Sequence, residues 1–176
     1  KLMMFIRKGS LADKEALFNL YLDVSKNQNG IARAPEEIDI LFIDDVFNNI
    51  IKKEGLLFLG EERKTEKVIA AIHAHKYGIG IFDHVLTHLT ILIHPDYQQQ
   101  GLGTELFQRF LSEIEKHRPD VKRVELESRA SNKKALRIYQ KLGFKHEGIL
   151  HQKTRNIDGS FEDSYVFAWE NKNFLY

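Results

Sequence analysis

The chain has 176 residues, which suits one domain, since single domains usually contain about 100 to 200 residues. It has no cysteine, which excludes disulfides, thiolate metal ligands and a cysteine nucleophile, and suits a reducing compartment. Lys and Arg number 26 against 25 Asp and Glu, so the formal net charge is +1 and no overall field recruits nucleic acid or an anionic membrane.

The apolar runs of the sequence are short. Leu89–Ile93 is among the longest, whereas a transmembrane helix needs about 20 residues. The N-terminus lacks the apolar core and cleavage site of a signal peptide, and Lys1 and Leu2 before Met3 resemble residues left by cloning. We therefore expect one domain over residues 3–176, located in the cytoplasm and not bound to a membrane.

The first part of the chain predicts one strand and two helices. We expect a strand over Met4–Lys8, followed by a helix that Ser10 caps and that ends near Lys26. Residues 27–35 include glycine and proline and predict a loop. The adjacent acids Glu36 and Glu37 favour the start of a second helix, because they complement the positive end of its dipole.

Strands and helices then alternate in a pattern typical of a mixed sheet. Residues 56–59 and 68–75 predict a hairpin, and residues 85–93 a third strand. The apolar positions of residues 101–117 lie on one helical face, residues 124–129 alternate as in a strand, and residues 132–142 predict a helix closed by Gly143. Two strands flank the turn at residues 156–160. The order predicts an α/β fold: a mixed, mostly antiparallel sheet of about seven strands with helices on both faces.

The most informative segment is the turn between the third of these strands and the helix at residue 101. An apolar strand ends before Pro95, and the helix opens on Gly101 and Gly103. Free amides at a helix start bind phosphate, and glycine lets the backbone approach it closely, although the same glycines would also permit a tight turn alone. Thr104 and Glu105 follow Gly103 where a P-loop needs Lys, and Leu106 stands where a dinucleotide-binding turn needs a third glycine.

The turn resembles the acetyl-CoA turn of the GNAT superfamily of N-acetyltransferases, whose pattern is Q/R-x-x-G-x-G/A. Gln98, Gly101 and Gly103 fit this pattern. A second motif of the superfamily follows at the expected distance, from Leu126 through Asn132 to Tyr139 and Phe144. Together the two motifs cover roughly residues 85–150, and the first half of the chain agrees in element order alone. The run of residues 126–132 is similar to that of the ribosomal-protein alanine acetyltransferases, and the tail at residues 158–163 to members that act on amino acids or protein N-termini.

The resemblance implies acetyl-CoA as cosubstrate, with no metal. It implies that strand backbone pairs with the pantetheine arm where the sheet splays, that the turn amides hold the diphosphate, and that an asparagine lies against the arm. The cofactor-binding residues implied are Ile91, Leu92, Ile93, Gln98, Gln99, Gln100, Gly101, Leu102, Gly103, Thr104 and Asn132.

The resemblance also implies two catalytic residues, Tyr139 and Glu127. Tyr139 would point at the thioester sulfur. A thiol with a pKa of about 8.5 is a stronger acid than a phenol with a pKa of about 10, so full protonation of the thiolate by Tyr139 is uphill by about 2 kcal/mol and a hydrogen bond is the expected role. Glu127, with Glu125 on the same strand face, would accept the proton of the acceptor amine through water. A water chain and a solvated, ion-paired Glu127 are the alternatives. Without cysteine, direct attack in a ternary complex is favoured.

The implied acceptor is a primary amine: an amino acid, another small amine or a protein N-terminus, with a polyamine next. A non-catalytic acyl-CoA-binding module or sensor of the same fold is the alternative function. The sequence leaves open whether the chain forms a homodimer. A nucleic-acid-binding module is a third possibility, supported by a basic concentration late in the chain and opposed by the near-zero net charge.

Four weaker patterns are also present. His73, His75, His84 and His88 are close in sequence and suggest a metal cluster, but hairpin-surface histidines are the favoured interpretation. His94 precedes the glycine turn and could touch the cofactor. Asp44 and Asp45 in the second helix could border the acceptor cleft, with ordinary exposed charge as the alternative. The late basic residues, Lys122, Arg123, Lys133, Lys134, Arg137 and Lys141, form either a solvated face or a contact for the 3′-phosphoadenosine end of coenzyme A.

Overall fold

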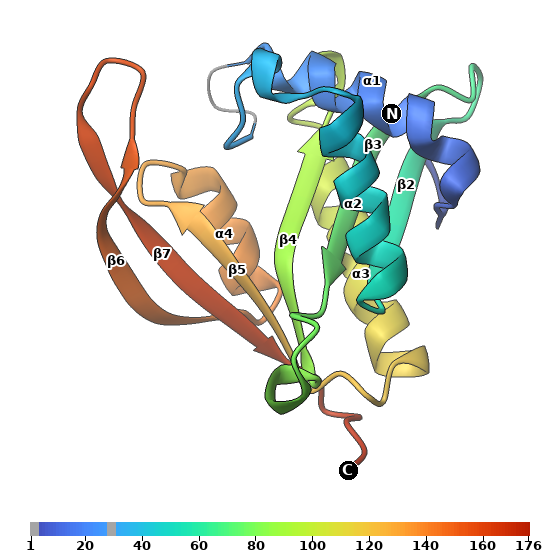
Figure 1. Cartoon of the computed structure of the whole chain (residues 1–176), viewed down its shortest axis with the longest axis vertical. Helices are drawn as coiled ribbons and strands as arrows, with labels where there is room; N and C mark the ends of the chain where they lie inside the picture. The colour runs from blue at the N-terminus through green and yellow to red at the C-terminus, as the bar shows by residue number, and fades with distance from the viewer. Residues whose placement is uncertain (1–3, 28–30) are drawn as a thin grey trace.

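The computed structural model describes residues 4–27 and 31–176, which fold into a sheet flanked by helices (Figure 1). The interpretation of Lys1 and Leu2, the predicted domain start at residue 3 and part of the predicted loop at residues 27–35 lie outside the described residues. The elements are β1 (Met4–Lys8), α1 (Lys14–Ser25), α2 (Ile40–Lys52), β2 (Leu56–Glu62), β3 (Val68–His75), β4 (Val85–Ile93), α3 (Leu102–His117), β5 (Arg123–Arg129), α4 (Lys133–Lys141), β6 (Lys145–Arg155) and β7 (Phe161–Glu170). None of the described helices is both long and apolar enough to cross a membrane.

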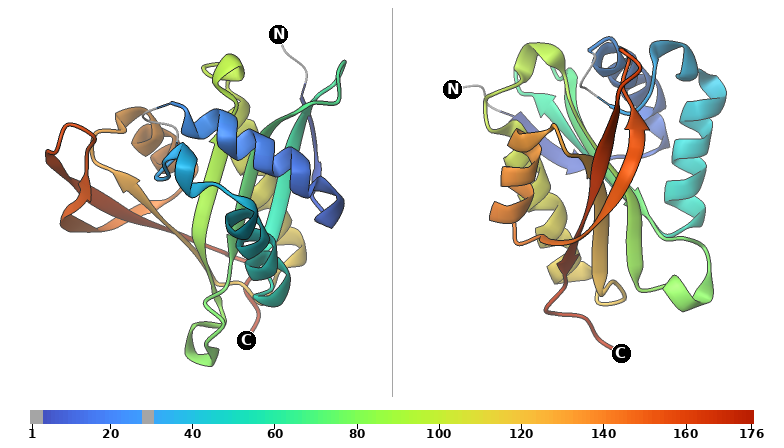
Figure 2. Two further views of the ribbon diagram at one scale, coloured as in Figure 1. Left: turned by 45° about the horizontal axis from the view of Figure 1, so that its top comes forward. Right: turned by 90° about the vertical axis from the view of Figure 1, so that its left-hand side faces the viewer.

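The sheet has seven strands in the order β1-β2-β3-β4-β5-β7-β6. All neighbouring pairs are antiparallel except β4 and β5, which run parallel. Helices α1 and α2 cover one face and α3 and α4 the other, giving three layers (Figure 2). The predicted fold class is therefore confirmed.

Alternation along β2 builds a core on each side of the sheet. Leu56 and Phe58 pack with the α3 side chains, whereas Leu57 and Leu59 pack with those of α1 and α2. Successive residues of a strand point to opposite faces, so a strand covered by helices on both sides is apolar at every position. This explains why β2 reads as a continuous apolar run and not as an alternating one.

Strands β4 and β5 separate soon after they meet. The only paired positions between them are Val85 with Arg123 and Leu86 with Val124, among the described residues. The next residues of β4 contain a register shift against β3, and His88 has a φ of 52°. A bulge of this kind bends the strand. The edge of β4 that faces β5 is consequently left without a strand partner along residues 87–93, and Figure 1 shows the two strands diverging.

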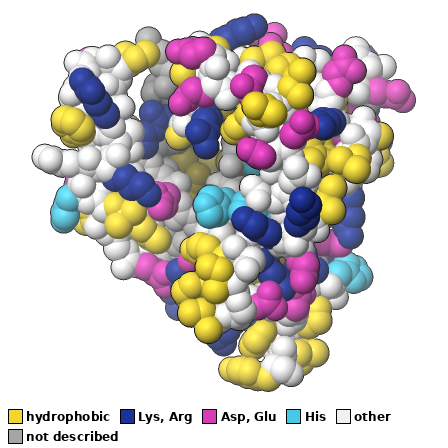
Figure 3. Space-filling model, viewed as in Figure 1, with side chains coloured by type: hydrophobic (Ala, Val, Ile, Leu, Met, Phe, Trp, Pro, Cys, Tyr) yellow, Lys and Arg dark blue, Asp and Glu magenta, His cyan; other side chains and the backbone are white. Residues whose placement is uncertain are grey.

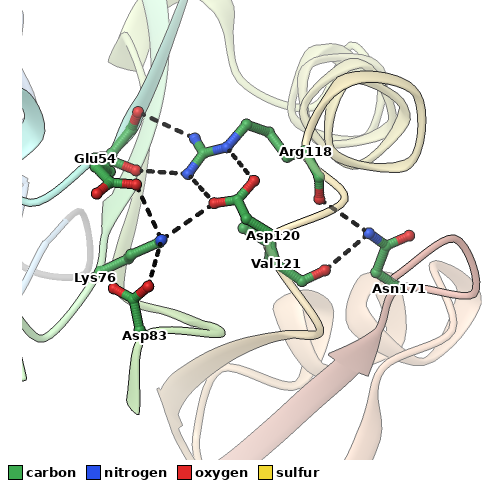
Figure 4. A network of polar contacts seen from close by, with 8 residues as sticks. Glu54, Lys76, Asp83, Arg118, Asp120, Val121 and Asn171 are labelled. Atoms are coloured by element: carbon green, nitrogen blue, oxygen red, sulfur yellow. Dashed lines mark hydrogen bonds and ion pairs between the residues drawn. The ribbon is translucent and has the colours of Figure 1, made fainter. Parts of the chain in front are cut away.

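An ion-pair network joins the loops at the end of the sheet where β4 and β5 meet (Figure 4). Its centre is Lys76, whose side chain is 3% exposed. The Lys76 ammonium lies 3.0 Å from Glu54, 3.1 Å from Asp120 and 3.4 Å from Asp83, and Arg118 also donates to Asp120. These residues come from the α2–β2, β3–β4 and α3–β5 connections, so the network joins these connections at the base of the diverging strands.

The second helix begins later than the sequence predicts. Residues 35–37 form a single 3-10 turn that ends in extended backbone at Ile38. Asp39 then caps α2, its carboxylate accepting a hydrogen bond from the Phe42 amide at 2.8 Å. Glu36 and Glu37 thus complement the short turn, and the α-helix starts at the residue that has a capping side chain.

Candidate functional site

A cleft of about 260 Å³ lies at the N-terminus of α3, and we call it the turn cleft. Residues of β4, the glycine turn and α4 line it. Nine of the predicted cofactor residues are among them: Ile91, Ile93, Gln98, Gln99, Gly101, Leu102, Gly103, Thr104 and Asn132. Residues that are distant in sequence are therefore brought to one surface.

The backbone of the turn leaves amides free at the start of α3. Gly101 has a φ of 77°, a left-handed conformation that side chains resist, and this glycine reverses the chain before the helix. The first amide of α3 that donates a helical hydrogen bond is that of Glu105, which donates to the Gly101 carbonyl at 3.1 Å. The amides ahead of it, at Leu102 to Thr104, are those that an α-helix leaves without intrahelical partners. With the positive end of the helix dipole, they form a site suited to an anion.

Gly103 is not required by the packing of the protein. A Cβ added there would lie 3.8 Å from the Ile93 side chain and 4.0 Å from that of Ile91, which are ordinary contacts. Its φ is not positive. The plain explanation of a glycine needed for helix packing therefore does not account for this position, whereas close approach of a ligand would.

Two predicted cofactor residues lie outside the lining. The Leu92 side chain is fully buried in the core on the α1 side, so only its backbone is available at the β4 edge. Gln100 is exposed and does not line the turn cleft. Asn132 has a structural function as well, since its side-chain oxygen caps α4 by accepting from the Ala135 amide at 3.3 Å.

A second cleft, of about 720 Å³, follows the same edge of β4, and we call it the strand cleft. Thr90 lines it and the next residue, Ile91, lines the turn cleft, so the two clefts border consecutive residues of β4. Its walls come from the segment after α1, from β4 and β5, and from the β6/β7 hairpin. Figure 3 shows this face of the molecule hollowed, with Lys and Arg side chains around the hollow.

Glu127 and Glu125 both line the strand cleft but have different partners. Glu127 is half exposed and is paired with Lys153 of β6, at 2.5 Å between Oε2 and Nζ. Glu125 is more buried, accepts a hydrogen bond from the Tyr77 hydroxyl and is paired with Arg123 at 2.9 Å. The carboxylate of Glu125 is thus held in place, and that of Glu127 has a single flexible partner.

Tyr139 lies in an aromatic cluster beside the strand cleft. Its ring contacts those of Phe107, Phe144 and Phe167, with centroids 5.8 to 6.1 Å apart. Burial raises the pKa of Tyr139, opposed by the nearby Ser128 hydroxyl, and Ser128 lines the strand cleft. Tyr139 itself lines neither cleft, and its phenol stays protonated at neutral pH.

The interpretation of the histidines as surface residues is wrong for two of them. His73 and His75 are buried, at 5% and 8% exposed, because β3 is covered on both faces. No group of three or more metal-ligating side chains occurs among residues 4–27 and 31–176. His94 is buried too, accepts from the Asp96 amide at 3.1 Å and lies 3.3 Å from Asp23, outside the lining of the turn cleft.

Further residues line the clefts, and of these only Lys134 was named from the sequence as a candidate contact for coenzyme A. Tyr97 and Lys134 line the turn cleft, and Arg33, His88 and Lys153 line the strand cleft. Of the late basic residues, Lys134 alone appears in these linings, and motif spacing gave no signal for the others named here. Neither Asp44 nor Asp45 lines the strand cleft, and Asp44 is paired with Lys14, which agrees with the alternative of ordinary surface charge.

Comparison with known proteins identifies the family. The model of the acetyltransferase (GNAT) family matches residues 15–144, most of the chain, and the chain belongs to this family. The resemblance read from the two motifs is confirmed. The ribosomal protein bS18-alanine N-acetyltransferase of Escherichia coli K12 is 39% identical over 82 residues, 47% of this chain and 53% of that protein. The N-alpha-acetyltransferase of Sulfurisphaera tokodaii is 34% identical over 80 residues, 46% of this chain and 45% of that protein. The chain thus matches about half the length of these relatives.

Solved structures agree with the fold over nearly the whole chain. A GNAT-family acetyltransferase from Streptococcus pneumoniae has a TM-score of 0.82 at 20% identity, covering 96% of this chain and 99% of that one. The Salmonella typhimurium protein yncA, solved with its cofactor acetyl-CoA, has a TM-score of 0.83 at 18% identity, covering 99% of this chain and 97% of that one. At these identities the likeness is one of fold.

Proposed function

We propose that this protein is an N-acetyltransferase that moves an acetyl group from acetyl-CoA to a primary amine by direct attack in a ternary complex. One observation supports this above the others: the turn cleft, at the free amides of the α3 start, and the strand cleft border consecutive residues of β4, Ile91 and Thr90. A donor bound in the first cleft and an acceptor bound in the second would meet near Thr90 and Ile91.

The turn cleft is proposed to bind coenzyme A. The amides of Gln99 to Thr104 hold the diphosphate, and the free backbone edge at Ile91 to Ile93 pairs with the pantetheine arm as a peptide adds to a sheet edge. The Asn132 side chain lies against this arm. Its oxygen already caps α4, which leaves the amide nitrogen to donate.

Tyr139 is proposed to stabilise the departing thiolate through a hydrogen bond. Because burial raises its pKa, transfer of the phenolic proton to a thiolate is even less favourable than for a free phenol. A protonated phenol in a largely apolar surrounding is nevertheless a strong donor to a developing anion.

Glu127 is proposed to accept the proton that the acceptor amine must lose. An alkyl ammonium with a pKa of about 10 is only about 0.1% neutral at pH 7, so a nearby carboxylate raises the share of productive encounters. In the absence of an acceptor, Lys153 occupies this carboxylate. An incoming ammonium therefore exchanges with that of Lys153.

The proposed acceptors are amino acids, other small amines and protein N-termini. The names of the curated relatives, an alanine N-acetyltransferase of ribosomal protein bS18 and an N-alpha-acetyltransferase, favour the N-terminal amine of a protein. We infer a cytoplasmic setting from the absence of cysteine, and no metal is needed for this chemistry.

Thiol release from acetyl-CoA, measured across a panel of amino acids, polyamines and peptides with different N-terminal residues, tests the proposal. The expected result is release that depends on one class of amine. Acetyl-CoA binding by calorimetry without release for any amine would instead support the acyl-CoA-binding module. Absence of acetyl-CoA binding, with salt-sensitive binding to DNA or RNA, would overturn both.

A further inference from the structure

A bulge in β6 turns Lys153 toward the strand cleft. Leu150 pairs with Ser164 and Thr154 pairs with Glu162, so β6 has three residues between these pairs where β7 has one. Within the bulge Gln152 has a φ of 52°, a left-handed conformation. Bulges next to active sites commonly change the direction of one side chain, and the side chain concerned here is that of Lys153.

The side chain of Asp163 holds the bulge. Its carboxylate accepts a hydrogen bond from the Gln152 amide at 2.9 Å and lies 3.6 Å from the His151 ring. Next to it, the Thr154 and Ser164 hydroxyls are 3.2 Å apart. The extra residues are therefore fixed at a definite place on the strand, and the position of Lys153 is part of the fold.

Lys153 reaches Glu127 across an intervening strand. In the sheet order β7 lies between β5 and β6, and Val166 of β7 is the residue opposite Glu127. The Lys153 ammonium nevertheless lies 2.5 Å from the Glu127 carboxylate. Among the described residues that line the strand cleft, Lys153 is the only lysine.

We propose that Lys153 is an acetylation site of this protein, modified by its own active site in the same chain. The inference rests on the proposed function. The Lys153 side chain is itself a primary alkyl amine, and it sits at the carboxylate assigned to receive the acceptor's proton. A tethered amine does not have to diffuse to the thioester, so its effective concentration there is high.

The reaction balances as an ordinary acyl transfer. The Lys153 ammonium gives one proton to Glu127, and its nitrogen attacks the thioester carbonyl. A carbon–nitrogen bond forms and the carbon–sulfur bond breaks. The second proton leaves the nitrogen with the departing coenzyme A thiolate, which becomes the thiol, and Glu127 returns its proton to water. The product is an amide at Lys153 without charge.

Acetylation also changes the strand cleft. An acetylated Lys153 has no ammonium to pair with Glu127, so the carboxylate is released toward an external acceptor. The charge of the described cleft lining falls by one. The modification would therefore mark chains that have met acetyl-CoA without an acceptor.

Peptide mass spectrometry after incubation with acetyl-CoA alone tests the proposal. We expect Lys153 to be acetylated about tenfold faster than Lys145, an exposed lysine on the same strand. The rate constant should not depend on protein concentration, and an excess of a good acceptor amine should suppress it. Glu127→Gln should lower the Lys153 rate to that of Lys145. Lys145→Arg is the matched control and should leave Lys153 acetylation unchanged, whereas Lys153→Arg should abolish the fast site.

The outcomes separate this inference from the proposed function. Thiol release with an external amine, together with Lys153 acetylated no faster than Lys145, would overturn the inference and leave the function standing. A first-order rate constant for Lys153 acetylation that rises with protein concentration would also overturn it, because the reaction would then occur between molecules. Failure of thiol release and of Lys153 acetylation together, with acetyl-CoA bound, would overturn the function as well.

Discussion

The hydroxyl of Tyr139 has a restricted position, because aromatic rings surround the rest of the side chain. The contacts with Phe107, Phe144 and Phe167 fix the ring, and Ser128 at the strand cleft is the polar group beside it. A fixed donor costs little reorganisation when charge develops at the sulfur. The cluster thus supports the proposed role of Tyr139 without placing it in the lining of a cleft.

Replacing Tyr139 with Phe tests that role. We expect kcat to fall about 10- to 100-fold, the loss of one hydrogen bond to a developing charge, while acetyl-CoA affinity stays within about twofold. Steady-state kinetics and calorimetry measure the two quantities. Tyr165→Phe, at a half-buried tyrosine of β7, provides the control and should change neither. An unchanged kcat in Tyr139→Phe would remove the residue from the mechanism.

His73 is a buried base with a defined protonation state. The Tyr21 hydroxyl lies 2.5 Å from its Nε2, and burial raises the pKa of Tyr21, so the tyrosine keeps its proton and donates. Burial lowers the pKa of His73 to about 4, with a smaller contribution from His75. His73 is therefore neutral, with the proton on Nδ1, which has no hydrogen-bond partner among the described residues.

This histidine predicts a pH-dependent stability. The unfolded chain takes up a proton on His73 below a pH of about 6.5, whereas the folded chain does so only near pH 4, so the free energy of unfolding falls as pH falls between these values. Between pH 7 and pH 5 the His73 contribution is a loss of about 2 kcal/mol. In urea unfolding, the free energy of unfolding of His73→Gln should not show this loss between pH 7 and pH 5. His117→Gln, at an exposed position, should retain it, and an equal slope in all three proteins would contradict the assignment.

The residues of the candidate site differ in how well the sequence predicts them. Gln98, Gly101 and Gly103 lie in one short motif and Asn132 in a second, so each could be named from local sequence, and the fold brings the two motifs to one surface. The pairing of Lys153 with Glu127 depends on strand order and on a two-residue excess in β6, which no local pattern records. The individual site residues of the final hairpin could therefore not be predicted from the sequence.

The start of α3 contains two glycines with different structural requirements. Gly101 needs its left-handed conformation, and Gly103 has ordinary space around it within the protein. The fold explains the first glycine, and the proposed binding of coenzyme A would explain the second. Substitution of each should therefore have effects of opposite sign on stability.

We expect Gly103→Ala to raise the free energy of unfolding by about 0.5 to 1 kcal/mol, since alanine favours a helix over glycine. It should also weaken acetyl-CoA binding at least about tenfold, because the methyl group occupies the path of the diphosphate. Gly101→Ala should instead destabilise the protein by about 1 kcal/mol through its positive φ. Chemical unfolding and calorimetry measure both. If Gly103→Ala binds acetyl-CoA as tightly as the unaltered protein, the diphosphate does not pass close to residue 103.

Most element boundaries follow from local pattern, and the exceptions have local causes. Strands β3 and β4 begin and end where periodicity predicts. Strand β2 runs on to Glu62, beyond the predicted Leu59, because β1 pairs with it there as far as the Met4–Glu62 position. Helix α2 starts later than predicted because its capping residue is Asp39, whereas Glu36 and Glu37 belong to the preceding 3-10 turn. Pairing partners and caps decide such ends, and neither is visible in apolar periodicity.

The two clefts exist because β4 and β5 are paired at one end and diverge at the other. Two paired positions are all that join them in the part of the chain that the structure describes, so the loops around the meeting point must hold the strands together. The Lys76 network does this. Burial lowers the pKa of Lys76, but hydrogen bonds to Glu54 and Asp120 outweigh burial and the net pKa is raised, so the ammonium stays charged.

Lys76→Met should destabilise the fold by about 2 kcal/mol at pH 7, because it leaves Glu54, Asp83 and Asp120 close together without their shared cation. We set this below the usual cost for a fully buried pair, since the three carboxylates are 39 to 66% exposed. Lys172→Met, which breaks an exposed pair with Glu115, should cost less than about 0.5 kcal/mol.

The pH dependence distinguishes a lost ion pair from lost packing. The Arg118 hydrogen bond, with help from Lys76, lowers the pKa of Asp120 to about 2, so its stabilising contribution is complete above a pH of about 4 and disappears as pH falls through 2. In Lys76→Met the pKa of Asp120 is higher, because the contribution of Lys76 is lost, so Asp120 takes up its proton at a higher pH. The difference in unfolding free energy between the two proteins should therefore shrink from pH 7 to pH 3. A difference that is constant with pH would mean that the lysine acts through the packing of its carbon chain and not through its charge.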